Sequence, residues 1–241
     1  MFAPLTVTYI DHMGSDKTVA AIARVSTTTE LDDLDELTPR DERLIRYLAR
    51  GCSKDEVPEP LTLGTARSIP THWTPFAHCL LTVRIHCSIF VARQLMRSNV
   101  GIVYNEMSRR YVDAEPTFAP LEFRRRSDRL KQGSSPDLVV DELMAEAVEK
   151  YLRTSIGLYN ALLKRGVAPE CARAILPLAT NTAIVATGSM MAWYRVVTQR
   201  RSEHAQKEIR QLASRIDGIC GRLWPVSWDA LMNPTQENSH E

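Results

Sequence analysis

Alternation of apolar and polar residues predicts strands in two segments of the chain. Residues 5–10, LTVTYI, alternate in this way and are rich in β-branched and aromatic side chains. Between residues 79 and 86, Leu81, Val83 and Ile85 alternate with polar side chains, which is typical of a strand with one buried face. The pattern therefore predicts two strands that lie far apart along the chain.

Most other segments carry apolar residues at helical spacing. This spacing predicts helices at residues 16–25, 40–50, 88–96, 169–175, 189–197 and 203–223. Ser15 or Asp16 is suited to cap the first helix, and Ser88 the third. Gly51 follows the second helix at the position where glycine commonly ends a helix.

The longest predicted helix begins at Ser135, which precedes a proline and an acidic residue in the order typical of a helix start. Its apolar face continues until Gly166. A helix of about 28 residues would be about 42 Å long. Such a length is well suited to packing against a second subunit.

The predicted elements favour an α+β fold, with a small, mainly antiparallel sheet packed with long helices. The strands are few and do not alternate regularly with helices, which argues against a doubly wound sheet. No linker rich in Pro, Gly or Ser divides the chain, so residues 1–232 are predicted to form a single domain. The polar residues 233–241 are predicted to be a disordered tail.

The charge balance argues against one class of function. Lys and Arg total 30 and Asp and Glu total 29, so the net charge is +1 and there is no overall basic field that would drive nonspecific nucleic-acid binding. We therefore expect no nucleic-acid partner. The basic run at residues 124–126 is interpreted as a solvated face, with RNA contact as the alternative.

Hydropathy predicts a cytoplasmic protein without membrane contact. No apolar run approaches the roughly 20 residues that span a bilayer. Residues 1–4 do not begin a secretion signal.

The five cysteines are spaced without a disulfide or zinc pattern, and we expect them to be buried thiols: Cys52, Cys79, Cys87, Cys171 and Cys220. His-Cys pairs occur at residues 78–79 and 86–87. On a strand they would lie about 26 Å apart, too far to share an ion. No metal site is predicted.

The most informative segment for chemistry is residues 90–111. It holds Glu106, Ser108 and four arginines: Arg93, Arg97, Arg109 and Arg110. Guanidinium groups beside a carboxylate and a hydroxyl suit a phosphorylated small molecule that accepts and donates hydrogen bonds. Neither common glycine-rich phosphate loop occurs, so side chains would have to hold a nucleotide or flavin.

Five ordered pieces of the chain resemble the flavin-dependent thymidylate synthases. They are ARVS at residues 23–26, HWTPFAH at 72–78, IFVARQLMR followed by YNEMSRRY at 89–111, ARAILPL at 172–178 and RRSEHAQKEI at 200–209. Together they span most of the chain in the order found in that family.

The resemblance implies a reaction and a set of cofactors. Members of the family methylate C5 of deoxyuridylate with the methylene group of methylenetetrahydrofolate, and FAD reduced by NADPH supplies the hydride. The resemblance also implies a homotetramer whose active sites are shared between subunits. The family uses no cysteine nucleophile, so Cys171 keeps its interpretation as a buried thiol.

Site residues follow by matching motifs. On the substrate side, the resemblance implies that these residues bind the uridylate: Gln94, Glu106, Ser108, Arg110, Arg173 and Arg200. Arg200 matches the arginine against the pyrimidine edge, where it can stabilise negative charge as C5 becomes nucleophilic, and it is the predicted catalytic residue. On the cofactor side, the matching residues are Ser26, His72, Thr74, Arg97, Glu106 and His204.

The chain departs from the family pattern mainly on the flavin side. Arg97-Ser98-Asn99 stands where the family has Arg-His-Arg, and one extra residue lies before Asn105. Ala77 stands where an acidic residue is expected, and residues 189–195 are more apolar than the pattern. We expect FAD to bind through altered contacts, with Asn99, Arg195 or Trp193 compensating.

The departures leave two further interpretations open. One is a branch with changed substrate choice, because the chain also resembles the flavin-dependent UMP methylases of polyoxin-type nucleoside antibiotic pathways, which accept the ribonucleotide. The other is a nucleotide-binding regulatory homologue that has lost flavin chemistry.

Overall fold

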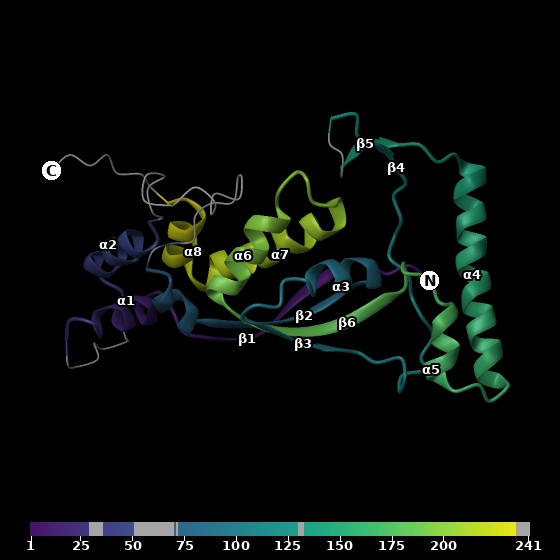
Figure 1. Ribbon diagram of the computed structural model, residues 1–241, viewed down its shortest axis with the longest axis horizontal. Helices are drawn as coiled ribbons and strands as arrows, with labels where there is room; N and C mark the ends of the chain where they lie inside the picture. Colours follow the sequence, from purple (N-terminus) through teal and green to yellow (C-terminus); the bar gives the residue numbers. More distant parts are fainter. Residues whose placement is uncertain (29–35, 51–69, 71, 130–132, 235–241) are drawn as a thin grey trace, which may run out of the picture.

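The computed structural model describes residues 1–28, 36–50, 70, 72–129 and 133–234. Its main sheet has four antiparallel strands in the order β1-β2-β6-β3 (Figure 1). The strands are β1 (Thr6–Met13), β2 (Leu80–Ser88), β3 (Ile102–Glu106) and β6 (Asn181–Ser189). Two short strands, β4 (Arg124–Arg126) and β5 (Ser134–Leu138), pair separately. The predicted α+β class with a small antiparallel sheet is confirmed.

The sequence pattern identified β1 and β2 but not β3 and β6. Along β6, Ile184 and Ala186 are buried while Val185 between them is exposed, so the strand does alternate. Small residues at many of its positions weaken the contrast that alternation needs. Strand β3 is short and lies at the edge of the sheet.

Helices cover one face of this sheet. In Figure 1, α3 (Ile89–Leu95), α6 (Met190–Arg200) and α7 (Lys207–Leu223) lie on the same side of the strands. The largest fully buried side chains of the core between these layers include Trp193, Phe76 and Leu81. A buried apolar layer of this kind supplies most of the driving force for folding.

A group of short elements lies at one end of the sheet, comprising α1 (Asp16–Arg24), α2 (Pro39–Leu48), the 3-10 helix η1 (Thr74–His78) and α8 (Pro225–Met232). Ser15 caps α1 as expected, because its side chain accepts a hydrogen bond from Thr18 N and the Thr18 hydroxyl accepts one from Ser15 N. Ser88 is the N-cap residue of α3, but its side chain makes no capping bond. Gly51 lies outside the described residues.

An arm built on α4 (Glu142–Lys164) lies at the opposite end. It carries α5 (Pro169–Ala172), the 3-10 helix η2 (Arg173–Ile175) and a second apolar cluster of Phe118, Leu152 and Ile156. The predicted start at Ser135 is wrong. Residues 134–138 form β5 instead, and Asp141 caps the helix by accepting a hydrogen bond from Met144 N. The helix therefore has 23 residues, and Gly166, with φ +81°, follows its end as expected.

Two predictions about single residue types need correction. Cys79, Cys87 and Cys220 are buried, whereas Cys171 is exposed, because only Ala172 of the four-residue helix α5 is buried. Arg124 is not simply solvated. Its side chain is 8% exposed and pairs with Glu122 at 2.9 Å and Glu208 at 2.8 Å. Cys52 and residues 235–241 of the predicted tail lie outside the described residues.

Among the described residues, no helix is long and apolar enough to cross a membrane. The same part of the chain holds no group of three or more His, Cys, Asp or Glu side chains that could bind a metal ion.

Candidate active site

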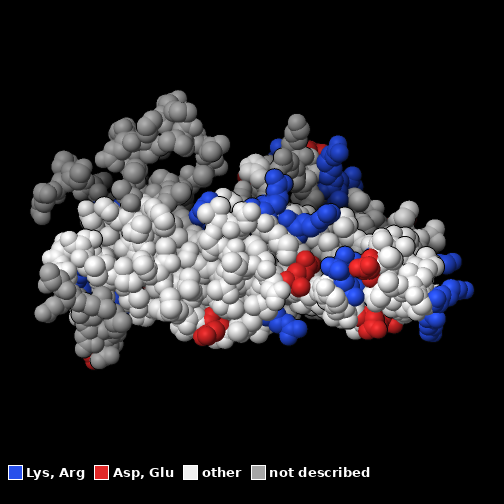
Figure 2. Space-filling model, turned by 60° about the horizontal axis from the view of Figure 1, so that its bottom comes forward, with Lys and Arg blue, Asp and Glu red and all other residues white. Residues whose placement is uncertain are grey.

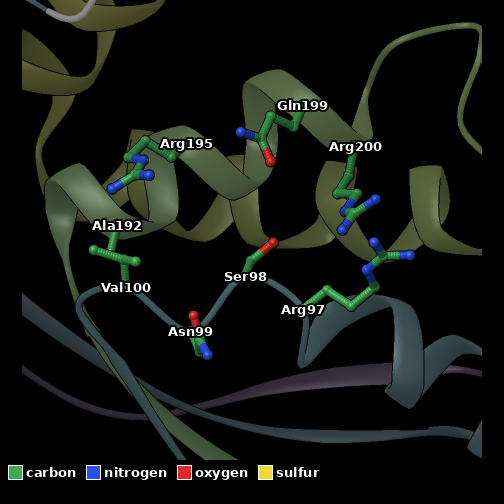
Figure 3. Close-up of a pocket in the computed structure, with 8 residues that line it drawn as sticks. All are labelled: Arg97, Ser98, Asn99, Val100, Ala192, Arg195, Gln199 and Arg200. Atoms are coloured by element: carbon green, nitrogen blue, oxygen red, sulfur yellow. The ribbon is translucent and has the colours of Figure 1, made fainter.

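A cationic hollow of about 380 Å³ lies between α6 and the segment that follows α3 (Figure 3). Eight residues line it: Arg97, Ser98, Asn99, Val100, Ala192, Arg195, Gln199 and Arg200. Three of these are arginines and none is acidic. The predicted residues Arg97, Asn99, Arg195 and Arg200 are thus brought together from two segments that are about a hundred residues apart in the sequence.

Two glycines allow the segment after α3 to lie this close to α6. Gly101 has φ +78°, a conformation that favours glycine, and its carbonyl accepts a hydrogen bond from Ser189 N at 3.2 Å. A Cβ atom on Gly188 would lie 2.8 Å from Ile102 Cγ1 and 3.2 Å from the Gly101 carbonyl oxygen. The hollow therefore depends on close backbone packing at the start of α6.

Arg200 is held in place from the side of α3. Its Nη2 donates a hydrogen bond to the carbonyl oxygen of Gln94 at 2.9 Å. Its Nε is buried and has no hydrogen-bond partner among the residues that the structure describes. Figure 3 shows the guanidinium groups of Arg97 and Arg200 pointing toward each other at one end of the hollow.

The electrostatics of Arg200 reflect this arrangement. Burial lowers the pKa of Arg200 below its ordinary value, the charge of Arg97 lowers it further, and Tyr104 acts in the opposite direction. A guanidinium group remains protonated despite such a shift. Two neighbouring cations without a carboxylate in the lining are an anion-binding arrangement.

These residues fit the flavin cofactor that the sequence resemblance implies. FAD carries a diphosphate and a ring edge rich in hydrogen-bond acceptors, which match the guanidinium groups of Arg97 and Arg195. A hollow of about 380 Å³ is at the small end of the usual range for ligand sites, so one chain encloses only part of such a molecule.

The predicted phosphate-binding residues form a different group, around the far end of β3. The Glu106 carboxylate accepts a hydrogen bond from the Thr182 hydroxyl at 2.7 Å, and Ser108 Oγ accepts one from Arg110 N at 3.3 Å. Arg110 Nε lies 3.3 Å from a carboxylate oxygen of Glu170 in α5. Arg173 is exposed in the adjoining η2.

These residues and the cationic hollow are not contiguous in one chain. Ile102 and Glu106, the two ends of β3, are separated by about 13 Å at the usual strand rise. Residues 97–100 lie before this strand and residues 108–110 lie beyond it. None of Glu106, Ser108, Arg110 and Arg173 lines the hollow.

The remaining predicted cofactor residues lie elsewhere on the chain. Ser26 follows α1, and Thr74 begins η1, which packs against α1. His72 stacks on Tyr47 of α2 with ring centroids 5.7 Å apart. His204 is exposed in the turn between α6 and α7.

Two further side chains have clear positions. Gln94 Nε2 donates to Gln206 Oε1 at 2.6 Å, which joins α3 to the start of α7. Trp193 was predicted to compensate for the altered flavin contacts, but its position in the fold rules this out. Its side chain is fully buried and its indole N–H donates to the carbonyl oxygen of Leu81 at 3.1 Å.

The motif comparison missed four residues that line the hollow: Ser98, Val100, Ala192 and Gln199. Ser98 and Val100 belong to the segment in which the chain departs from the family pattern, and that departure was the available signal. Gln199 precedes the predicted catalytic residue. Ala192 could not be found from the sequence, because it lines the hollow only with a small apolar side chain in the first turn of α6.

The chain is similar to known proteins over most of its length. The profile of the family described as thymidylate synthase complementing protein matches residues 8–226. The flavin-dependent thymidylate synthase of Streptomyces avermitilis is 32% identical over 245 aligned positions, which cover 94% of this chain and 90% of that protein. An enzyme of the same name from Thermus thermophilus is 32% identical over 226 positions, with 93% and 74% covered.

A solved structure shares the fold. It is a UMP/dUMP methylase, PolB, from Streptomyces cacaoi bound with 5-Br dUMP. Its TM-score is 0.76, with 26% identity and 95% of each chain covered. The same methylase bound with 5-Br UMP gives a TM-score of 0.72. With the family profile matching most of its length, this chain belongs to the family of the flavin-dependent thymidylate synthases.

Proposed function

We propose that this protein catalyses the FAD-dependent reductive methylation of C5 of a uridine 5'-monophosphate nucleotide, dUMP, UMP or both. In this proposal methylenetetrahydrofolate donates the carbon and NADPH reduces the flavin. The observation that carries the proposal is the cationic hollow in which Arg97 and Arg200 face each other without a carboxylate in the lining. It lies in a chain whose relatives are named flavin-dependent thymidylate synthases.

Arg200 is the proposed catalytic residue. C5 of a uracil ring becomes nucleophilic when negative charge can accumulate on the ring oxygens and nitrogens. A guanidinium group fixed beside the ring stabilises that charge without having to lose a proton. The hydrogen bond from Arg200 to the Gln94 carbonyl fixes the group, and its partnerless Nε remains available for the ring.

Ser108 and Arg110 are proposed to bind the nucleotide phosphate, with Arg173 and Glu106 beside them and Gln94 as a further uridylate contact. A hydroxyl and a guanidinium group are suitable donors for a phosphate dianion. Because Arg110 pairs with Glu170 through exposed side chains, that ion pair costs little to exchange for a phosphate.

Arg97, Asn99 and Arg195 are proposed to hold FAD, together with Ser26, His72, Thr74, Glu106 and His204. When bound, the reduced flavin supplies the hydride equivalent that turns a transferred methylene group into a methyl group. The contribution of the protein is to orient the cofactor and to balance its negative charge. Asn99 and Arg195 line the hollow, which supports their role in place of the family's usual residues.

We also propose a homotetramer in which different chains complete each active site. The phosphate-binding group and the cationic hollow do not meet in one chain, and a mononucleotide with a flavin must contact both. On the side of the sheet away from the helices, Figure 2 shows a broad area with few charged side chains. The exposed Arg84 of β2, which pairs with Val185, lies on this face. The exposed Val103 and Val185 of β3 and β6 belong to that face, which suits contact with another chain.

The decisive experiment offers dUMP and UMP in competition to the purified protein with methylenetetrahydrofolate, FAD and NADPH. The methylated products are then identified by mass spectrometry. PolB is named a UMP/dUMP methylase, so we expect methylation of at least one nucleotide and regard both as candidates. If neither nucleotide is methylated, the proposed activity is wrong.

The second candidate function is a nucleotide-binding regulator without flavin chemistry. The observation in its favour is that Ser98 and Asn99 replace residues that the family uses on the flavin side. This candidate predicts nucleotide binding without a yellow chromophore and without tritium release from 5-tritiated uridylate. Quenching of added FAD fluorescence by the protein would argue against it.

A further inference from the structure

Tyr104 of β3 reaches back to the segment that connects α3 to β3 and holds it by hydrogen bonding. The Tyr104 hydroxyl donates a hydrogen bond to the carbonyl oxygen of Ser98 at 2.8 Å, and the carbonyl oxygen of Leu95 lies 3.3 Å away. Leu95 also accepts a hydrogen bond from Ser98 N at 2.9 Å. One side chain therefore connects the last turn of α3 to the segment that carries Arg97 and Asn99.

The position of Tyr104 is itself fixed by the sheet. Its backbone pairs with Ala186 of β6, and its side chain packs against the main core. Burial raises the pKa of Tyr104 to about 12, so its hydroxyl keeps the proton that it donates at physiological pH. The positive charge of Arg200 acts in the opposite direction on this pKa.

Other contacts leave the segment little support. Gly101 anchors its far end through the hydrogen bond from Ser189 N, while Asn99 and Val100 are exposed. No other group in the described part of the chain donates a hydrogen bond to the Ser98 carbonyl. Three hydrogen bonds thus hold residues 98–101 in the described structure: from Ser98 N to Leu95, from Ser189 N to Gly101, and from the Tyr104 hydroxyl to Ser98. Of these, the bond from Tyr104 is the one made by a side chain.

We propose that Tyr104 is a positioning residue that fixes the segment of residues 97–100 so that Arg97 and Asn99 face the flavin. The proposal rests on the proposed function for the identity of the ligand. It concerns the segment in which this chain departs from the family pattern and is one residue longer. A flexible segment loses conformational entropy when it binds a ligand, and this loss weakens binding. A segment that is already fixed avoids the loss and binds its ligand more tightly.

The test compares Tyr104→Phe with the wild type. Tyr9→Phe is the matched control, because it also removes one tyrosine hydroxyl bond, to His12 Nδ1, from the strand at the other edge of the same sheet. Two quantities are measured: the FAD dissociation constant by fluorescence quenching, and amide hydrogen exchange in the protein without flavin. Phenylalanine keeps the ring, so packing of the ring is retained.

We expect Tyr104→Phe to weaken FAD binding roughly 2- to 10-fold, the range that corresponds to one net hydrogen bond. Exchange at residues 98–101 should accelerate by a similar factor, while exchange in β2 stays unchanged. Tyr9→Phe should change neither quantity. A loss of stability alone would instead accelerate exchange in β2 as well and would overturn the positioning role.

The two proposals fail in distinguishable ways. If wild-type protein binds no FAD, the proposed function is wrong, while the exchange measurement still tests whether Tyr104 holds the segment. If the wild type binds FAD and Tyr104→Phe binds it equally well, Tyr104 does not position the flavin contacts. Unchanged exchange at residues 98–101 would overturn the proposal independently of any flavin.

Discussion

Arg200 combines three properties that are seldom found together in a structural arginine. It is partly buried, it faces another cation, and it has a buried donor atom without a partner. A structural arginine normally satisfies its donors with carboxylates or carbonyl groups. The cost of leaving Nε unpaired is consistent with a group that awaits a ligand.

Arg200→Ala should therefore lose turnover but retain flavin. We expect kcat to fall by about 10²- to 10³-fold, the effect of removing one electrostatic donor from the transition state. The FAD dissociation constant should change little, because Arg97 and Arg195 still line the hollow. Product formation and fluorescence titration measure the two effects, and loss of flavin binding with turnover intact would contradict the assigned role.

At the phosphate end of the site, Arg110→Ala should raise KM for the nucleotide roughly 10- to 100-fold, since a hydrogen bond to a charged group contributes about 1.5–3 kcal/mol. Ser108→Ala should have a smaller effect in the same direction. The phosphate does not react, so kcat should stay close to the wild-type value.

Glu170→Gln is the control for this pair. It removes the negative charge beside Arg110 but keeps the shape of the side chain. KM should stay the same or fall, because the carboxylate competes with the phosphate. An increase in KM similar to that of Arg110→Ala would mean that the ion pair, and not phosphate binding, is what matters.

At the scale of the elements, the buried carboxylate of Asp41 links α1 to α2. Asp41 is fully buried, and its Oδ2 accepts hydrogen bonds from Thr38 N at 2.8 Å and from the Thr38 hydroxyl at 2.7 Å. Lys17 and Arg24 of α1 pair with the same carboxylate. Burial alone would raise the pKa of Asp41, but these hydrogen bonds and cations outweigh it and hold the pKa well below its usual range.

Asp41→Asn should lower the free energy of unfolding at pH 7 by about 3 kcal/mol, because it leaves two partly buried cations without their carboxylate. A depressed pKa in the folded state gives stability that is present above the unfolded pKa of about 4 and is lost as the pH falls. The free energies of unfolding of the wild type and the variant, measured by urea unfolding, should therefore become similar as the pH is lowered below about 4.

The matched control is Asp229→Asn, which breaks an exposed ion pair with Arg46 between α8 and α2. Asp229→Asn should change the free energy of unfolding by no more than about 0.5 kcal/mol, both at pH 7 and below about pH 4. If Asp41→Asn were equally mild at pH 7, the carboxylate would not be an important link between α1 and α2.

Some helices and strands could be predicted from the sequence and others could not. The start of α1 was predictable because Ser15 and Thr18 cap it through local contacts alone. Ser135 has an equally good local signal, yet residues 134–138 pair with β4, and tertiary pairing overrides local preference there. Strand β6 lies at the centre of the sheet, but its small residues concealed an alternation that is visible only in its burial.

The same distinction applies to the site. Motif matching predicted Arg97, Arg200, Ser108 and Arg110 as site residues because each lies within a recognisable local string. It could not place them relative to one another, since that depends on the length of β3 and on packing at Gly188. Tyr104 was missed because its role appears only when its hydroxyl is seen to reach back to Ser98.

At the scale of the whole molecule, the cationic hollow and the predicted phosphate-binding residues are separated within one chain. This separation leads to a prediction about how chains assemble. Arg200 lines the hollow beside residues 97–100, which precede β3, whereas Arg110 lies beyond the other end of this strand. We propose that an active site that uses both arginines takes them from two chains, as in closed homo-oligomers with shared sites. Arg200→Ala and Arg110→Ala subunits carry complementary defects. A mixed oligomer can then contain sites with both arginines intact, although neither variant alone has any.

We therefore expect activity to reappear when the two variants are mixed in equal amounts and allowed to exchange subunits. If each site takes one arginine from each of two chains at random, about a quarter of the sites should be intact. Activity is measured at a dUMP concentration well below the KM of the Arg110 variant, where both variants alone are weak. If a single chain supplied both arginines, every site would keep one defect, and mixing would give only the average of the two separate activities.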